Sequence, residues 1–179
     1  MNLLVGTKKG LFLLDRQGQG KVYTVVADKS FQQIDVVESI NMAICICGKK
    51  NKLKAYYLSK LLQKILKTED GRTPRNSNSE FSSIGDLEGF VCLFFSALIL
   101  FSRVICFRMV TFQRIRFLVI ATKETIEIYA WAPKPYHKFM PFKSFGNLPH
   151  RPLLVHLTVE EDSRIKVTGK AMFLFLISI

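Results

Sequence analysis

The chain has 179 residues and a formal net charge of +12, from 26 Lys and Arg against 14 Asp and Glu. Hydrophobic residues make up 49% of it, which excludes wholesale disorder, and the length suits one domain with a sizeable core. The positive charge leaves several interpretations open: a solvated basic surface, or a partner that is a nucleic acid, an anionic lipid or an acidic protein face.

Short apolar segments separated by turns fill the first third of the chain. The predicted strands cover residues 3–5, 11–14, 21–27, 31–37, 42–47 and 53–58. Polar, Gly-containing turns separate them, and Gly48–Asn51 has the composition of a tight hairpin turn. Strands this short and this regularly interrupted are typical of an all-β sandwich, barrel or propeller.

One segment has the helical period instead. Leu58, Leu61, Leu62 and Ile65 follow the spacing i, i+3, i+4, i+7, and Lys60 lies between them. The pattern predicts a short amphipathic helix after the strand at 53–58. A helix on a membrane surface is the alternative, but the segment is short enough for a local helix between strands.

A polar stretch at 68–83 predicts a loop, and an apolar run follows at 90–107. The apolar run is interrupted at Arg103 after residues 90–102, which are 13 positions. A bilayer-spanning helix needs roughly 20 apolar residues, so the run is short for a transmembrane segment.

The second half again predicts strands, at residues 116–121, 125–130, 137–142 and 153–159. Thr125–Tyr129 alternates between polar and apolar side chains, as a half-buried strand does. Pro133, Pro135 and Pro141 interrupt the connections and argue against helix in this region.

Residue patterns for catalysis and metal binding are missing from the sequence. It has no Gly-rich kinase loop, no HRD or DFG element, no P-loop spacing and no Gly-x-Ser-x-Gly elbow. His137, His150 and His156 lack the i, i+4 spacing of a zinc helix. We therefore expect no catalytic residue, no metal site and no cofactor.

The cysteines predict buried free thiols. Cys45, Cys47, Cys92 and Cys106 have no disulfide-framework spacing, and Cys45 and Cys47 share one face of a predicted strand. The chain start lacks the pattern of a signal peptide, so we expect a cytoplasmic location, where thiols stay reduced.

Several long segments resemble the citron homology domain of the Misshapen/NIK-like germinal-centre kinases. The opening segment 2–23, Gly85–Gly89, residues 114–121, the segment around Trp131 and residues 152–161 carry the likeness. The resemblance implies an incomplete β-propeller of about three to four WD-repeat-like blades with one short helix. The Nik-related branch looks nearest within the group.

The resemblance also sets the expected domain limits. It covers residues 1–167, with an apolar insertion at 90–103 that has no family counterpart, and an unrelated apolar tail at 168–179. The segment from Phe90 has the composition of a translated intron end, and the codons of Gly169-Lys170 can resemble a splice donor, so both segments are interpreted as retained intron. A propeller fragment of this kind exposes surface that its missing blades would cover, so we expect poor solubility.

The function implied by the resemblance is regulatory protein binding without catalysis, with Ras/Rap-type small GTPases or cytoskeletal signalling proteins as partners. Nucleic acid is not an expected partner. Possible interaction residues are Lys134, Tyr136, His137 and Lys138, in a basic, aromatic, Pro-bounded loop. The alternative is that Trp131, Tyr136 and Phe139 only pack between blades. A second hypothesis is a small basic membrane-associated protein anchored through residues 90–107.

Overall fold

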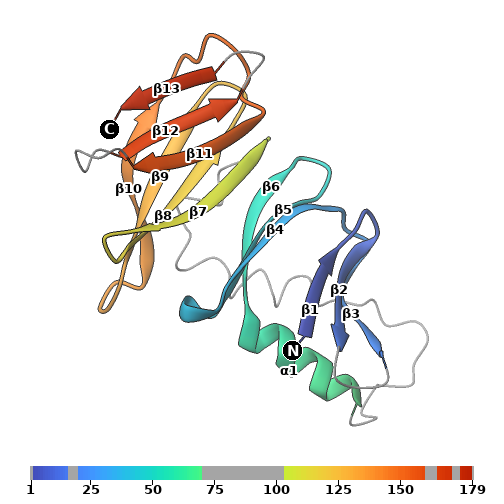
Figure 1. Cartoon of the computed structure of the whole chain (residues 1–179). Helices are drawn as coiled ribbons and strands as arrows, with labels where there is room; N and C mark the ends of the chain where they lie inside the picture. Colours follow the sequence, from blue (N-terminus) through green and yellow to red (C-terminus); the bar gives the residue numbers. More distant parts are fainter. Residues whose placement is uncertain (1, 16–19, 70–102, 160–164, 171–173, 179) are drawn as a thin grey trace. The chain divides into compact units, whose positions relative to one another are not determined.

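The computed structural model describes residues 2–15, 20–69, 103–159, 165–170 and 174–178 (Figure 1). The chain divides into two compact units, residues 1–100 and 101–179. In the described residues, all extended segments belong to antiparallel sheets, and a single α-helix accompanies them. The expectation of an all-β fold with one short helix is confirmed.

The first unit contains two three-stranded sheets. One sheet has the order β1-β2-β3 and the other the order β4-β5-β6, so every strand pairs with its neighbour in the sequence. The elements lie within two residues of the predicted segments: β1 Asn2–Gly6, β2 Gly10–Asp15, β3 Val22–Ala27, β4 Phe31–Val37, β5 Met42–Cys47 and β6 Lys52–Tyr57. The predicted hairpin turn joins β5 to β6, with positive φ at Gly48 (76°) and Asn51 (47°).

The predicted helix is present as α1, Leu58–Glu69, directly after β6 (Figure 1). Leu61 and Ile65 are buried in the core of the first unit, whereas Leu62 is 46% exposed. Asn41, which precedes β5, accepts hydrogen bonds from two N–H groups in the first turn of α1. Its backbone carbonyl accepts from the Leu58 N–H (3.0 Å), and its side-chain oxygen accepts from the Ser59 N–H (3.0 Å).

The core of the first unit lies among both sheets and α1. Alternate residues of β5, namely Ala43, Cys45 and Cys47, point into it. The sheets approach closely at Gly6, where an added Cβ would lie 2.8 Å from the Cβ of Phe31 on β4. A glycine is therefore required at this contact.

The second unit contains a four-stranded and a three-stranded sheet, again made from consecutive strands. Their orders are β10-β9-β8-β7 and β11-β12-β13. The strands are β7 Cys106–Phe112, β8 Ile115–Ala121, β9 Ile126–Ala132, β10 Lys138–Phe145, β11 Leu154–Val159, β12 Ile165–Lys170 and β13 Leu174–Ser178. The predictions gave β8 to β11 to within three residues at each end, but they did not give β12 and β13.

The core of the second unit joins its two sheets. Phe117 and Val119 on β8, Ile126 and Ile128 on β9 and Val155 on β11 are buried together. Cys106 lies at this junction and is hydrogen-bonded to the backbone of Val155. The long sheet is therefore held against β11 at the end where β8 leads into β9.

One kind of turn occurs in the described part of both units. Between β1 and β2, the Thr7 hydroxyl accepts hydrogen bonds from the N–H groups of Lys9 and Gly10, both at 3.1 Å. Between β8 and β9, the Thr122 hydroxyl accepts from Glu124 (3.3 Å) and Thr125 (3.0 Å). The same Thr-Lys turn thus closes the β1–β2 hairpin of one sheet and the β8–β9 hairpin of another.

Candidate protein-interaction site

The turn between β9 and β10 contains Lys134, Tyr136 and His137, and Lys138, the fourth residue that the sequence selected, follows it. Pro133 begins it, and the Pro133 carbonyl accepts hydrogen bonds from the N–H groups of Tyr136 (3.0 Å) and His137 (3.2 Å). His137 has a positive φ of 44°. These contacts fold residues 133–137 into a compact loop that leads directly into Lys138, the first residue of β10.

All four selected residues are exposed. Lys134, His137 and Lys138 lie at the surface, and Tyr136 is 59% exposed. The Lys138 Nζ lies 5.9 Å from the centroid of the Tyr136 ring, within the range of a cation–π contact. The turn therefore presents an aromatic ring with a cation beside it.

Trp131 and Phe139, two of the three aromatic residues in the packing alternative, pack against each other as a cross-strand pair within one sheet. Phe139 is buried, and its ring meets Trp131 edge-on at 5.0 Å between centroids. Trp131 also lies 6.5 Å from the His137 ring. Tyr136 is not part of this packing, because most of its surface is open. Trp131 and Phe139 thus support the turn, and Tyr136 projects from it.

A second turn lies at the same end of the sheet. Gln113 and Arg114, both with positive φ, join β7 to β8. Because β7 to β10 form an antiparallel meander, the β7–β8 turn and the β9–β10 turn lie at the same end of the sheet (Figure 1). Arg114 and its neighbour Ile115 are exposed. The sequence pattern did not single out these two residues as site candidates. The order of the predicted strands could have done so, because alternate turns of a meander share one end of the sheet.

The β10 strand adds apolar surface that was also missed. Met140 is 42% exposed and Phe142 is 49% exposed. The pairing of β10 with β9 shifts between Pro141 and Lys143, so Phe142 is the extra residue of a β-bulge. Its ring meets Phe117 edge-on at 5.3 Å. The bulge therefore holds a large aromatic side chain half open at the surface.

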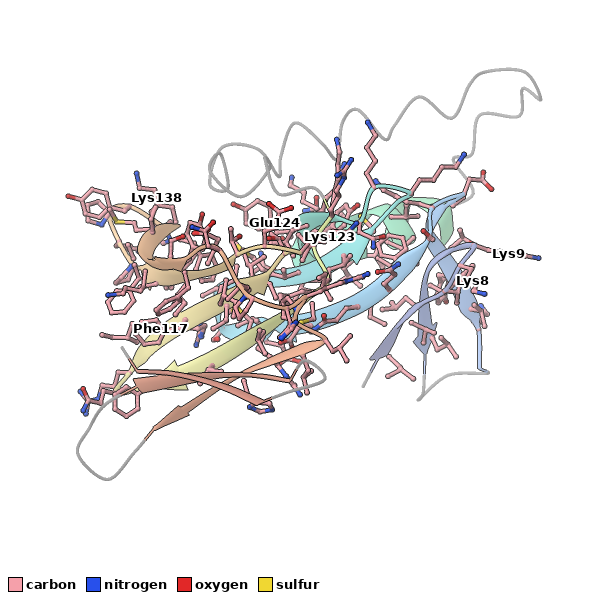
Figure 2. The ribbon with its side chains drawn as sticks, turned by 90° about the horizontal axis from the view of Figure 1, so that it is seen from above. Lys8, Lys9, Phe117, Lys123, Glu124 and Lys138 are labelled. Carbon is pink, nitrogen blue, oxygen red and sulfur yellow. The ribbon has the colours of Figure 1, made fainter. Side chains whose placement is uncertain are left out.

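The described charged side chains at this end of the sheet, Arg114, Lys134 and Lys138, are all positive. The described carboxylates of the second unit are Glu124 and Glu127, and both lie toward the other end of the sheet. Figure 2 shows Lys138 and Phe117 toward one side of this unit and Glu124 away from them. Glu127 also accepts a hydrogen bond from the Ser144 hydroxyl (2.7 Å). Cations at the two turns thus have no carboxylate near them among the described residues of the second unit.

The most strongly shifted titratable groups lie elsewhere, in the core of the first unit. A hydrogen bond from the Cys45 thiol lowers the pKa of Cys47 to about 7, against burial and with help from Lys29 and Lys54. The same hydrogen bond, together with burial, raises the pKa of Cys45. Cys45, Cys47 and Cys106 are buried free thiols, as predicted, and Cys92 lies outside the described residues.

The described part of the chain shows no cluster of three or more His, Cys, Asp or Glu side chains suited to a metal ion. Within those same residues, no helix combines the length and hydropathy that crossing a bilayer requires. The apolar run at 90–107 is described only from Arg103, and its last residues, Cys106 and Phe107, form the start of β7. Residues 90–102 of the insertion and residues 70–83 of the predicted loop lie outside the described residues. The loop prediction was wrong at Thr68 and Glu69, which are the last residues of α1.

Comparison with solved structures gives a neighbour that shares the fold. The AfRom2 CNH domain superimposes with a TM-score of 0.53 at 15% sequence identity, covering 99% of this chain and 48% of that one. At this identity the likeness concerns the fold alone.

Sequence comparisons are more specific. Misshapen-like kinase 1 from Rattus norvegicus is 52% identical over 169 residues, covering 93% of this chain and 11% of that protein. Serine/threonine-protein kinase mig-15 from Caenorhabditis elegans is 47% identical (93% and 14%), and Nik-related protein kinase from Mus musculus is 32% identical (93% and 11%). The higher identities to the first two contradict the expectation that the Nik-related branch lies nearest. The chain spans about a tenth of the length of these relatives.

The family model that matches describes the CNH domain, and not a kinase domain, over residues 1–174. The match extends seven residues past the expected limit at 167, into the strands β12 and β13. By this match and these identities, the chain belongs to the CNH domain family.

Proposed function

We propose that the chain is the non-catalytic, regulatory protein-binding part of a germinal-centre-type serine/threonine kinase, and that it contacts its partner through the β9–β10 turn. The observation that carries this proposal is the exposed turn of Lys134, Tyr136, His137 and Lys138, supported from beneath by Trp131 and Phe139. Tyr gives large contact area at low entropic cost, and basic neighbours add orientation.

The partner that we propose is a small GTPase of the Ras/Rap type, with cytoskeletal signalling proteins as further partners in the cytoplasm. The support is the family resemblance, since the regulatory domain of some of these kinases binds such GTPases. The proposed architecture is a partial propeller of about three to four blades. Sheets made of consecutive antiparallel strands, and a Thr-Lys turn repeated in two of them, agree with blades.

The test is equilibrium binding of the full chain to a purified Ras/Rap-type GTPase in its GTP-loaded and GDP-loaded forms. We expect saturable binding that prefers the GTP-loaded form, and Tyr136→Ala should weaken it by about tenfold or more. The control is Lys123→Ala, which changes an exposed residue at the other end of the same sheet. Tyr23→Ala in the first unit is not suitable, because the Tyr23 side chain is partly buried. Equal binding by both nucleotide forms, or none, would argue against a GTPase effector.

The domain limits remain a proposal: a citron homology segment at 1–167 with an insertion at 90–103 and an added tail at 168–179. Sequencing the transcript across codons 85–110 and 160–179 tests it. Messages that omit the two segments would support the proposal that they are retained intron. Messages that always contain them would show that both belong to the protein.

A further inference from the structure

Register places side chains of three strands on one face of the long sheet, at the end that carries the two turns. Phe117 lies opposite Ala130, and Ala130 lies opposite Met140, so these three point to the same face. Ile115 is two residues from Phe117 on β8, and Lys138 is two residues from Met140 on β10, so both point to that face as well. Lys138 lies opposite Ala132. Large side chains of β8 and β10 thus flank two small ones on β9.

Phe117 on this face belongs to the buried core of the unit, whereas Ile115, Lys138 and Met140 on the same face are exposed. We use the name tip surface for the exposed residues of this face and of the two turns beside it: Arg114, Ile115, Tyr136, Lys138, Met140 and Phe142. Ile115, Tyr136, Met140 and Phe142 are each more than two-fifths exposed. The flanking strands β8 and β10 lie about 10 Å apart across β9, which is the width that a single extended segment can cover.

The tip surface is apolar at its centre and positive at its margin. Arg114 lies at one side and Lys138 at the other, with Lys134 and His137 in the turn beyond. The nearest described carboxylates in this unit, Glu124 and Glu127, belong to the opposite end of the sheet. Cations with no carboxylate beside them among the described residues of this unit, around exposed apolar side chains, are complementary to a partner with acidic and apolar residues.

Strand addition at the edge is a less suitable mode. β10 is the edge strand of its sheet, but Pro141 has no N–H and the bulge at Phe142 breaks the regular ladder. Side chains on the face, rather than the backbone of the edge, are therefore what the partner meets.

We propose that the tip surface binds an acidic protein segment that carries at least one large apolar side chain, with the apolar group over Ile115, Met140 and Phe142 and carboxylates near Arg114 and Lys138. This inference rests on the proposed protein-binding function and names the chemistry of the partner. It also extends the site from one turn to two turns and the bulge on the edge strand β10.

Fluorescence anisotropy of the full chain with a short labelled peptide tests the inference, the peptide having acidic residues on both sides of a central Phe-Leu pair. We expect saturable binding that Lys138→Glu weakens about tenfold and Met140→Ala weakens by a smaller factor. Lys123→Glu is the matched control, since it makes the same charge change at the other end of the sheet. It should alter binding less than about twofold.

Two peptide controls separate the two kinds of contact. A peptide with the Phe-Leu pair replaced by Ser-Ser should bind weakly, and a peptide with Lys for each acidic residue should not bind. Equal weakening by Lys123→Glu and Lys138→Glu would overturn the inference, because it would indicate attraction by net charge alone. If Lys138→Glu does not give the wild-type circular dichroism spectrum, Lys138→Gln takes its place.

The outcomes distinguish this inference from the proposed function. GTPase binding that survives Tyr136→Ala and Lys138→Glu, without peptide binding, overturns the tip surface and leaves a protein-binding domain. Peptide binding without GTPase binding supports the tip surface and rejects the GTPase. Lys138-dependent binding to phosphatidylserine vesicles, with no peptide binding, overturns the inference in favour of a lipid surface.

Discussion

Cys45 and Cys47 show how one residue sets the ionisation of another in this fold. They lie two apart on β5, so both thiols point into the same core, and each changes the pKa of the other in the opposite direction. The largest effect on Cys47 is the hydrogen bond from Cys45, which stabilises the thiolate. Burial acts against ionisation in both, so the hydrogen bond decides which thiol ionises first.

Removing the donor should therefore raise the pKa of Cys47. We expect the Cβ carbon resonance of Cys47 to titrate near pH 7 in the wild-type chain and at distinctly higher pH in Cys45→Ala, measured by NMR with labelled cysteine. Cys106→Ala, in the other unit, is the control and should leave the midpoint unchanged. An unchanged midpoint in Cys45→Ala would show that Lys29 and Lys54 dominate instead.

Among the elements, α1 contains two adjacent leucines that differ strongly in burial. Leu61 is 4% exposed and packs in the core, while Leu62 is 46% exposed. Leu61→Ala should lower the free energy of unfolding by about 2–5 kcal/mol because it leaves a cavity, and Leu62→Ala should cost much less. Urea denaturation followed by circular dichroism measures both. Equal losses would mean that α1 packs by a different face.

The contact between β1 and β4 gives a second prediction at this scale. A Cβ at Gly6 would meet the Cβ of Phe31, which is close to the backbone and cannot rotate away. Gly6→Ala should therefore lower the free energy of unfolding by about 1–3 kcal/mol. Gly146→Ala is the control, because nothing lies within 4 Å of an added Cβ there. A stable Gly6→Ala protein would show that the two sheets can separate without loss.

The elements were more predictable than the site. Alternating and helical patterns gave β1 to β6 and α1 closely, because Leu61, Ile65 and the apolar residues of β5 directly reflect burial. Leu62 was wrongly grouped with them, since periodicity cannot say how wide the buried stripe is. The selected turn residues are exposed, but Ile115, Met140 and Phe142 were missed, because strand register and the bulge after Pro141 depend on tertiary pairing.

For the whole molecule, the buried thiols and tyrosines predict how stability depends on pH. Burial raises the pKa of Cys106 above its ordinary 9.0 and that of Tyr129 above 10.0, and the pKa of Cys45 is raised as well. Groups of this kind ionise first in the unfolded chain, so their stabilisation is complete below the ordinary pKa and is lost as pH rises through the folded value. Cys47 behaves oppositely, and its stabilisation is lost as pH falls through about 7.

Stability should therefore be greatest between about pH 8 and 9 and should fall above that range. Urea midpoints measured at intervals from about pH 6.5 to 10.5 check this. Cys106→Ala should lose less stability than the wild-type chain on the alkaline side, because one ionising group is gone. A midpoint that stays constant from neutral to alkaline pH would contradict the assignment of these thiols as buried and protonated.

The strict succession of strands has a consequence for how the chain is made. In the described part of the chain, every ladder joins strands that follow one another in the sequence, from β1 with β2 to β12 with β13. Short separations between paired strands keep the entropic cost of closing each connection low. During synthesis, the first sheet has all its strands once residue 27 has left the ribosome, and each later sheet follows in turn. No strand described here must wait unpaired for a partner made much later.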